Sequence, residues 1–252
     1  MTRGIKKFLY GILYIIVFTL IIFFIYDITI APSPTCFDEI KNQNEIGVDC
    51  GGICNSCAIK NIENLKVSQK PELFGLESGK AVLLSEIFNP NINYDASSFS
   101  YTIQIYNSSG EVIEKIFGTD TIFASHKKYI FEAGIQTPFF KITRAEITFS
   151  NISWQPASET PDSRFTISNI KTDIGSSTIS ISGDIQNQSA LISQDAKLIG
   201  IFFDLFGQKL FVSQTLISNM SSFETREFKI LIPKDAHTMN NLDTHGSKVF
   251  AY

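Results

Sequence analysis

The sequence predicts a mainly β protein with an N-terminal transmembrane helix, a small disulfide-rich module and two tandem β-sandwich domains. Three observations predict this order. Residues 8–26 form an uncharged apolar run, and all four cysteines lie between Cys36 and Cys57. From residue 65 onward, short apolar runs alternate with turn residues, and the whole series occurs twice. Such alternation is typical of antiparallel strands in a sandwich.

The apolar run at residues 8–26 has the length of a membrane span. At about 1.5 Å per residue its helix reaches roughly 28 Å, close to the thickness of a bilayer's hydrocarbon core. The flank before it carries three basic residues and no acid, whereas residues 27–57 carry five acids and one lysine. By the positive-inside bias, we predict a cytoplasmic terminus at residues 1–7 and a signal-anchor helix at 8–30 in contact with the lipid bilayer. The remainder is then extracytoplasmic, in a periplasm or at the cell surface.

The alternative to an anchor is a cleaved secretory signal peptide, which also has a basic start and an apolar run. Its apolar region is usually about 7 to 15 residues long, shorter than the run in this chain. The small-residue exit at residues 29–31 is weak. We therefore prefer an uncleaved anchor, with the Pro-Ser-Pro sequence at residues 32–34 ending the helix.

Composition and histidine content exclude several classes of function. A net charge of −4 without a clustered basic face argues against a nucleic-acid partner, because such proteins displace phosphate counterions with lysine and arginine. Of the three histidines, His126 lies in a polar bend where we expect it to be solvated, and His237 and His245 lie in the polar C-terminal tail. The sequence has no phosphate-binding glycine loop, dinucleotide fingerprint or zinc-protease helix. We predict a protein that is not an enzyme and has no cofactor.

Residues 31–60 are predicted to form a module held by disulfides. The cysteines Cys36, Cys50, Cys54 and Cys57 are interspersed with glycines, and the segment has too little apolar content for a core. In an oxidising compartment, two disulfides are the default for such a pattern. The spacing leaves all three pairings open.

Two metal-binding alternatives compete with disulfides and plain turns in this module. Structural zinc sites usually present two C-x-x-C knuckles, and this stretch has one. Calcium would need hard oxygen ligands, although the D-x-[DN]-x-[DN]-G register is absent. The weak calcium candidates are Asp38, Asn42, Asn44, Glu45 and Asp49. We prefer to interpret these five as solvated turn residues.

The segment resembles the short module C-x-D-G-I-x-N-x-x-E-x-G-x-D-C-G-G-x-C-x-x-C of exported microbial and some animal surface proteins. The matching residues are Cys36, Asp38, Ile40, Asn42, Glu45, Gly47, Asp49, Cys50, Gly51, Gly52, Cys54 and Cys57. Glu39 replaces the glycine that usually follows the first aspartate. The resemblance implies a structural role for the module.

The β region is predicted to be a tandem repeat of two sandwiches. The first series of apolar runs lies at residues 81–88, 99–106, 112–117, 128–133 and 144–149. Four segments of the first copy align with the second at an offset of 97 or 98 residues, starting from the pairs Ser85 and Gly183, Tyr106 and Phe203, Thr121 and Ser218, and Tyr129 and Arg226. A constant offset of this kind indicates tandem domains.

The predicted boundaries follow from this repeat. The domains span residues 61–154 and 165–234, and the polar, proline-containing linker 155–164 is expected to let them stand end to end. The tail at residues 235–252 has neither period nor apolar mass, so we expect it to be flexible. Its last four residues are compatible with an edge strand, which we do not assign.

Each copy resembles the FxLYD-type immunoglobulin-like domains of bacterial envelope proteins, in which an apolar-aromatic-Asp strand end precedes a D-x-x-G hairpin. The matching residues are Phe202, Phe203, Asp204 and Gly207 in the second copy, and Ile105, Tyr106, Asn107 and Gly110 in the first. Both copies lack the leading phenylalanine, having Gly200 and Ile103 there. The resemblance implies tandem immunoglobulin-like domains without catalytic residues.

Two aromatic features are candidate binding surfaces. Trp154 is either a sugar-stacking platform or, as we prefer, a core or interdomain residue. Phe202, Phe203, Leu205 and Phe206 form either an exposed patch or, as we prefer, a strand buried on both faces. Our leading hypothesis is a non-enzymatic binding or structural protein that acts in adhesion or envelope assembly, with another envelope protein or a surface polymer as partner. Alternatives are a membrane-tethered solute or carbohydrate binder and an accessory subunit of an envelope complex.

Overall fold

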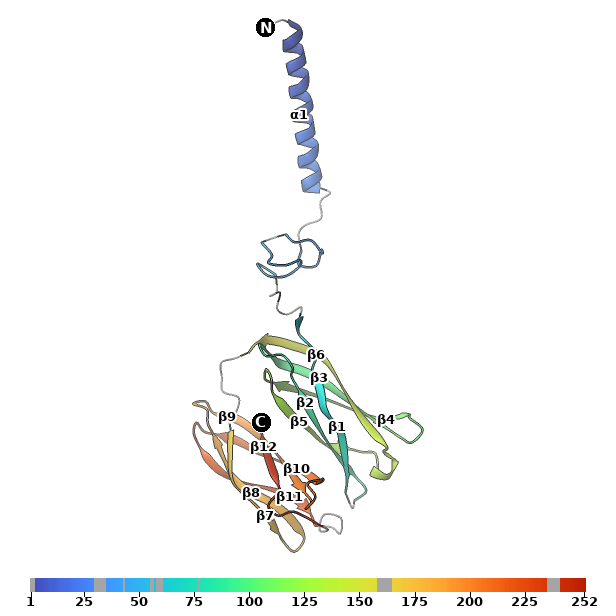
Figure 1. Cartoon of the computed structure of the whole chain (residues 1–252), viewed down its shortest axis with the longest axis vertical. Coiled ribbons are helices and arrows are strands. Elements are labelled where there is room, and N and C mark those ends of the chain that lie inside the picture. The colour runs from blue at the N-terminus through green and yellow to red at the C-terminus, as the bar shows by residue number, and fades with distance from the viewer. Residues whose placement is uncertain are drawn as a thin grey trace. The chain divides into compact units, whose positions relative to one another are not determined.

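The structure is a computed structural model. It describes residues 3–29, 35–42, 44–54, 57, 61–76, 78–157, 165–234 and 241–252. The chain divides into two compact units, Met1–Asn61 and Ile62–Tyr252. The first unit holds the N-terminal helix and the cysteines, and the second holds the strands β1 to β12 (Figure 1).

Helix α1 spans Arg3–Thr29, so the predicted apolar run is helical. Every described side chain on it, at residues 3–26, is exposed. The hydroxyl of Thr19 donates to the carbonyl oxygen of Ile15, 2.8 Å away, which pairs this polar group inside the helix. A helix that is apolar all round belongs in an apolar environment, and α1 is long enough and apolar enough to cross a membrane. The proline segment at 32–34 lies outside the described residues.

The described part of the second unit is built from strands and the 3-10 turn η2. The bounds are β1 Lys66–Gly75, β2 Ala81–Phe88, β3 Tyr94–Tyr106, β4 Val112–Ile122, β5 Lys127–Ile135, η2 Phe139–Lys141, β6 Arg144–Pro156, β7 Phe165–Ile174, β8 Thr178–Asn187, β9 Ser193–Phe203, β10 Lys209–Met220, β11 Thr225–Pro233 and β12 Lys248–Ala251. All pairings between these strands are antiparallel. The predicted mainly β fold class is confirmed.

The two halves of this unit have the same topology. The first has sheets of order β1-β2-β5 and β4-β3-β6, and the second has sheets of order β7-β8-β11 and β10-β9-β12. Side chains from both sheets of a half meet in a buried core, which in the first half includes Leu83, Ile103 and Ile130. Strand β3 buries every second residue from Phe99 to Ile105, as a strand with one face on a core should.

Local turn chemistry supports the alignment of the two copies. Asn89 directly follows β2 and Asn187 is the last residue of the equivalent strand β8, and both side chains are fully buried. At the hairpins, Asn107 and Asp204 each accept two backbone N–H bonds through Oδ1, and the glycines three residues later, Gly110 and Gly207, have φ near +80°. A positive φ of this size favours glycine.

The sequence alignment of the fifth strand, β5 with β11, is one residue out. Ser85 pairs with Ile130 and Gly183 pairs with Phe228, so Ile130 is equivalent to Phe228. The sequence alignment had paired Phe131 with Phe228. A slip of one residue moves a strand's side chains to the opposite face, and the structural register places two core residues, Ile130 and Phe228, at the same position.

The prediction of a flexible tail was wrong for residues 241–252. Strand β12 pairs with β9 and takes the place that β6 has in the first half. Phe250 pairs with Ile199, and five residues of this segment, including Leu242 and Tyr252, pack against the buried core. The second sandwich therefore extends to Tyr252. Residues 235–240, with His237, lie outside the described residues.

The expectation that the two sandwiches stand end to end was also wrong. One buried cluster contains Phe74, Tyr129 and other residues of the first sandwich together with the core of the second. Phe74 lies edge-on to Phe211 with ring centres 6.2 Å apart, and Tyr129 lies edge-on to Phe250 at 4.8 Å. Of the predicted linker, residues 155 and 156 belong to β6, and 158–164 lie outside the described residues.

Candidate functional site

A cavity of about 450 Å³ lies where the two sandwiches meet. Residues that line it include Asp95, Phe123, His126 and Lys128 from the first sandwich and Phe165 and Tyr252 from the second. Ligand sites occur preferentially at domain interfaces, and this volume is within their usual range of about 300 to 1,000 Å³. This junction cleft is the first candidate site.

The turn between β4 and β5 forms one wall of the junction cleft. Asp95 at the start of β3 is buried, and its Oδ1 accepts the N–H of Ala124 at 2.7 Å. His126 is half-buried, with Nδ1 2.5 Å from the carbonyl oxygen of Ala124, and its ring lies edge-on to Phe123. The sequence-based expectation of a solvated His126 therefore underestimated its packing. Its contacts are those of a residue that shapes a turn.

The start of β5, next to this turn, carries a network of paired charges. Lys128 Nζ lies 2.5 Å from Asp120 Oδ1 and 5.4 Å from the centre of the Tyr252 ring. Lys127 Nζ lies 2.8 Å from the carboxylate of the buried Glu86. Because each lysine already has a carboxylate partner, the wall suits an uncharged ligand better than an ion.

Burial raises the pKa values of two tyrosines at the junction, Tyr129 and Tyr252. Desolvation, followed by a hydrogen bond to Glu86, raises the pKa of Tyr129 to about 12. Desolvation is also the main reason why the pKa of Tyr252 is raised. Both phenols therefore remain protonated near neutral pH. Of the two, only Tyr252 lines the cleft, where its neutral hydroxyl can orient a polar ligand atom by hydrogen bonding.

The aromatic residues singled out in the sequence separate into two environments. Phe202 is fully buried, and Phe203 packs against the same core. Leu205 and Phe206 lie in the β9–β10 turn and are 67% and 78% exposed. Trp154 packs against the core of the first sandwich. The preferred core interpretation is thus correct for Trp154 and for the strand residues, whereas the turn residues are surface.

In the cysteine module, the disulfides are Cys36–Cys54 and Cys50–Cys57, a pairing that spacing had left open. The Sγ atoms of Cys36 and Cys54 and a carboxylate oxygen of Glu45 lie within 4.8 Å of one another. Because both sulfurs belong to a disulfide, they offer no thiolate to a metal ion. This group therefore does not supply the four ligands of a structural zinc site.

The acids proposed as calcium ligands accept backbone N–H groups. Asp49 accepts the N–H groups of Asp38 and Glu39, and Glu45 accepts those of Asn42 and Asp49. Hydrogen bonds to Asp38 from Thr35 N–H, then the Asn42 amide, then Ile40 N–H, lower the pKa of Asp38. These bonds hold the turns of the module.

The remaining calcium candidates do not add a clear ligand set. Asn44 is exposed at φ +61°. The Oδ1 of Asn42 is buried without a hydrogen-bond partner among the described residues. We assign no metal site to the module.

The C-terminal histidine that the structure describes also lies in a turn. His245 is exposed, and its N–H donates to Asp243 Oδ1 at 2.9 Å. This bond closes the turn that leads into β12. The imidazole Nδ1 lies 3.3 Å from the hydroxyl of its neighbour Thr244.

Sequence reasoning missed the junction cleft. Its walls come from segments more than 120 residues apart, such as those of Lys128 and Tyr252. The available signal was the short apolar run at residues 249–252, which is compatible with a strand but does not identify the partner it packs on.

No protein-family model matches the chain, and no curated protein matches it. Among solved structures, the chain is similar at TM-score 0.26 and 10% identity to a red sea bream transglutaminase, over 77% of this chain and 32% of that one. It is similar at TM-score 0.20 and 12% identity to a β-glucuronidase from glycoside hydrolase family 2, over 80% of this chain and 25% of that one. The chain thus spans about a third or less of those two proteins, and likenesses this weak identify neither a family nor an activity.

Proposed function

We propose that this chain is a single-pass membrane protein whose C-terminal part is extracytoplasmic and acts in binding or assembly rather than catalysis. The length and apolar surface of α1 support an anchor. Arg3, Lys6 and Lys7 before the apolar run support a cytoplasmic N-terminus. Two disulfides support an oxidising compartment for the part of the chain after the anchor.

The observation that carries an assembly role is the edge strand β4. It pairs with β3 on one side and is an edge of its sheet. Three of its apolar side chains face solvent, Val112, Ile113 and Phe117, and Phe117 is 72% exposed. Proteins usually protect an edge with charges, bulges or covering segments, because an open edge pairs with other strands. Strand β4 carries Glu114, Lys115 and Asp120, but Glu114 and Asp120 have partners within the chain. We infer that β4 accepts a strand from a partner envelope protein by β-augmentation.

The paired Asx turns at Asn107 and Asp204 support the proposed likeness to FxLYD-type domains. In both copies an apolar-aromatic strand end runs into a turn whose fourth residue is a glycine with positive φ. This likeness adds no catalytic residue to the proposal.

The test of partner binding is capture by the full-length chain from its own membranes. Phe117→Lys places a charge on the β4 edge and should abolish recovery of a specific partner. Phe206→Lys is the matched control, since Phe206 is 78% exposed in a turn away from β4. Equal recovery with both variants, or no specific partner with the unsubstituted chain, would count against the proposal.

The proposed orientation has its own test. We expect external protease to digest residues after the anchor while the N-terminus stays protected. Protection of the whole chain in intact cells, relieved by opening an outer membrane, would place it in a periplasm. Free thiols in the purified chain would contradict an oxidising compartment.

A second candidate function is binding of a small uncharged solute in the junction cleft. The cavity of about 450 Å³ favours it, whereas the packing of Trp154 on the core removes the main argument for sugar stacking. Ser97 lines the cavity, so Ser97→Trp should fill it. A solute that raises the melting temperature of the unsubstituted chain should then have no effect on this variant.

A further inference from the structure

The disulfide module turns its large apolar side chains outward. In the part that the structure describes, these residues are between 45% and 89% exposed: Phe37, Ile40, Ile46, Val48 and Ile53. The interior is taken up instead by Cys50 and by the carboxylate of Glu45, which are both 5% exposed. The module is thus stabilised by disulfides and N–H bonds, and its apolar surface is left for something else to cover.

The length of the chain keeps this surface near the membrane. Thr35 lies six residues after Thr29, where α1 ends. Even when fully extended, six residues reach only about 20 Å. The headgroup and interfacial regions together add about 10 to 15 Å to the hydrocarbon thickness of a bilayer. A module that begins so close to a spanning helix is therefore within reach of the interface.

We propose that the module lies on the extracytoplasmic membrane surface, with exposed apolar side chains inserted at the boundary between headgroups and acyl chains. The inference rests on the proposed function, in which α1 spans the bilayer. Phe37, the most exposed of the five at 89%, is the leading contact. Interfacial segments bury Trp, Phe and Leu side chains at this depth.

Charge specifies the class of lipid. Among residues 35–57 there are four acids, Asp38, Glu39, Glu45 and Asp49, and one lysine, Lys41. An acidic module is repelled by anionic headgroups. The surface therefore fits a zwitterionic leaflet and attaches through apolar burial rather than through charge.

The test places single tryptophans in the full-length chain, reconstituted in phosphatidylcholine nanodiscs with or without bromine on the acyl chains. Phe37→Trp reports on the module, and Phe206→Trp is the control, since Phe206 is 78% exposed in the second unit. Trp154 is present in every variant and is subtracted with the unsubstituted chain. We expect bromine to remove most of the added fluorescence at position 37 and little of it at 206. A second variant, Ile53→Trp, repeats the measurement, and thiol titration verifies that both disulfides are intact.

Equal fluorescence at position 37 with and without bromine, in a chain that resists alkaline carbonate extraction, overturns the inference and leaves the anchor standing. Release of the unsubstituted chain by carbonate overturns the anchor itself. Quenching that requires anionic lipid contradicts the assigned lipid class. Shielding of position 37 only in nanodiscs that hold two chains would assign the surface to a second copy.

Discussion

The backbone N–H of Tyr129 donates a hydrogen bond to the hydroxyl of Tyr252, 3.1 Å away and 123 residues later in the chain. Tyr129 belongs to β5 of the first sandwich, and Tyr252 follows β12 of the second. A second polar contact between the sandwiches is the ion pair of Lys209 in β10 with Glu72 in β1, at 2.5 Å. The junction therefore combines these two polar contacts with a shared apolar core. Such a joint holds the two sandwiches as one body.

Tyr252→Phe removes the hydroxyl while keeping the ring, and should lower the free energy of unfolding by about 0.5 to 1.5 kcal/mol. Tyr252→Ala also removes the ring that packs on the core and faces Lys128, so its loss should be larger, about 3 kcal/mol. Urea unfolding of the detergent-solubilised chain measures both. Phe206→Ala, at an exposed turn, is the control. Equal stability of all three variants would show that the junction does not hold the body together.

Alkaline pH should weaken the same junction. Desolvation, then a hydrogen bond to Glu86, raises the pKa of Tyr129 from 10.0 to about 12. Because the folded state holds this proton more tightly than the unfolded state, the stabilisation is complete below pH 10 and is lost as pH rises through 12. Rapid pH-jump experiments with near-ultraviolet circular dichroism measure the loss. Tyr129→Phe should make this pH dependence shallower, and an unchanged profile would contradict the assignment.

The two buried asparagines should be among the most sensitive positions. Asn187 Nδ2 donates to the carbonyl oxygens of Leu191, Met220 and Ser221 at 2.9, 3.4 and 3.0 Å. Asn187→Ala leaves these carbonyls without their donor and should lower the free energy of unfolding by about 1 to 3 kcal/mol. Asn187→Asp should be worse at neutral pH, because a carboxylate has no N–H to donate.

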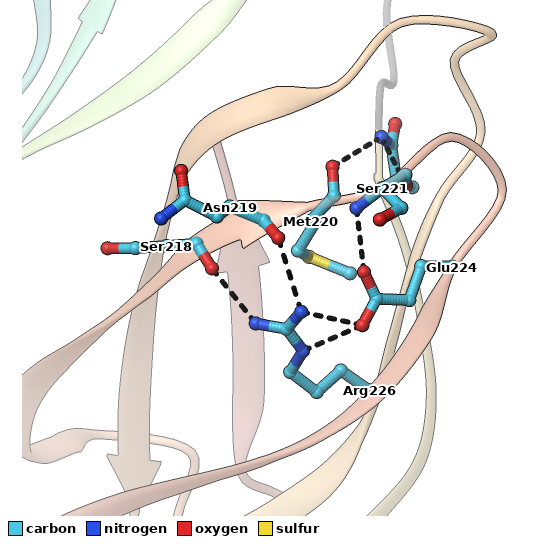
Figure 2. A network of polar contacts seen from close by, with 7 residues as sticks. Ser218, Asn219, Met220, Ser221, Glu224 and Arg226 are labelled. Carbon is cyan, nitrogen blue, oxygen red and sulfur yellow. Dashed lines mark hydrogen bonds and ion pairs between the residues drawn. The ribbon is translucent and has the colours of Figure 1, made fainter.

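The turn beside Asn187 is further braced by Arg226, which donates to the carbonyl oxygens of Ser218 and Asn219 and to Glu224 (Figure 2). Because Arg226 holds this turn, its backbone cannot move to give the carbonyl oxygens a new donor when the Asn187 amide is removed. Gln188→Ala, next in sequence and exposed, is the control and should be nearly neutral. If Asn187→Asp were as stable as the unsubstituted chain, the hydrogen bonds from Asn187 Nδ2 would not contribute to stability.

Glu39→Gly should stabilise the cysteine module. Glu39 is exposed and has φ +60°, a conformation that L-residues adopt at a penalty of roughly 1 kcal/mol and glycine adopts freely. The variant should therefore resist reduction by dithiothreitol longer, as measured by alkylation and mass spectrometry. Glu39→Ala removes the charge but keeps the side-chain clash, so it should give no gain. A gain with alanine would point to charge rather than conformation.

Gly118→Ala tests the packing of Tyr101 across β4. A Cβ atom at Gly118 would lie 2.2 Å from Tyr101 Cζ, and the Tyr101 hydroxyl is held by a 2.6 Å hydrogen bond to Glu132. The substitution should lower the free energy of unfolding by about 1 to 3 kcal/mol. Gly134→Ala, with open space around the new Cβ, is the control. In a Tyr101→Leu background the effect of Gly118→Ala should shrink, and an unchanged effect would rule out this contact.

The candidate sites were only partly accessible from the sequence. The tight-turn role of Glu39 is one example, because the departure from glycine was visible and the structure places that residue at positive φ. The exposure of Phe206 followed from the D-x-x-G match at Asp204 and Gly207, which places Phe206 in a turn, whereas the interpretation of the aromatic run as one buried strand did not use that match. The junction cleft could not be predicted from the sequence, because residues of both folded sandwiches line it.

By itself the sequence determined what depends on neighbours along the chain. An apolar run long enough to span a bilayer, cysteines within one short loop, alternation along strands and the equivalent asparagines Asn89 and Asn187 all express local geometry, and the structure contains each of them. Only the tertiary structure decided the disulfide pairing, the pairing of β12 with β9 and the packing of the two sandwiches against each other through Phe74 and Phe211. These contacts join residues that are distant in sequence or have several equivalent partners, so shape and apolar burial in the folded chain select among them.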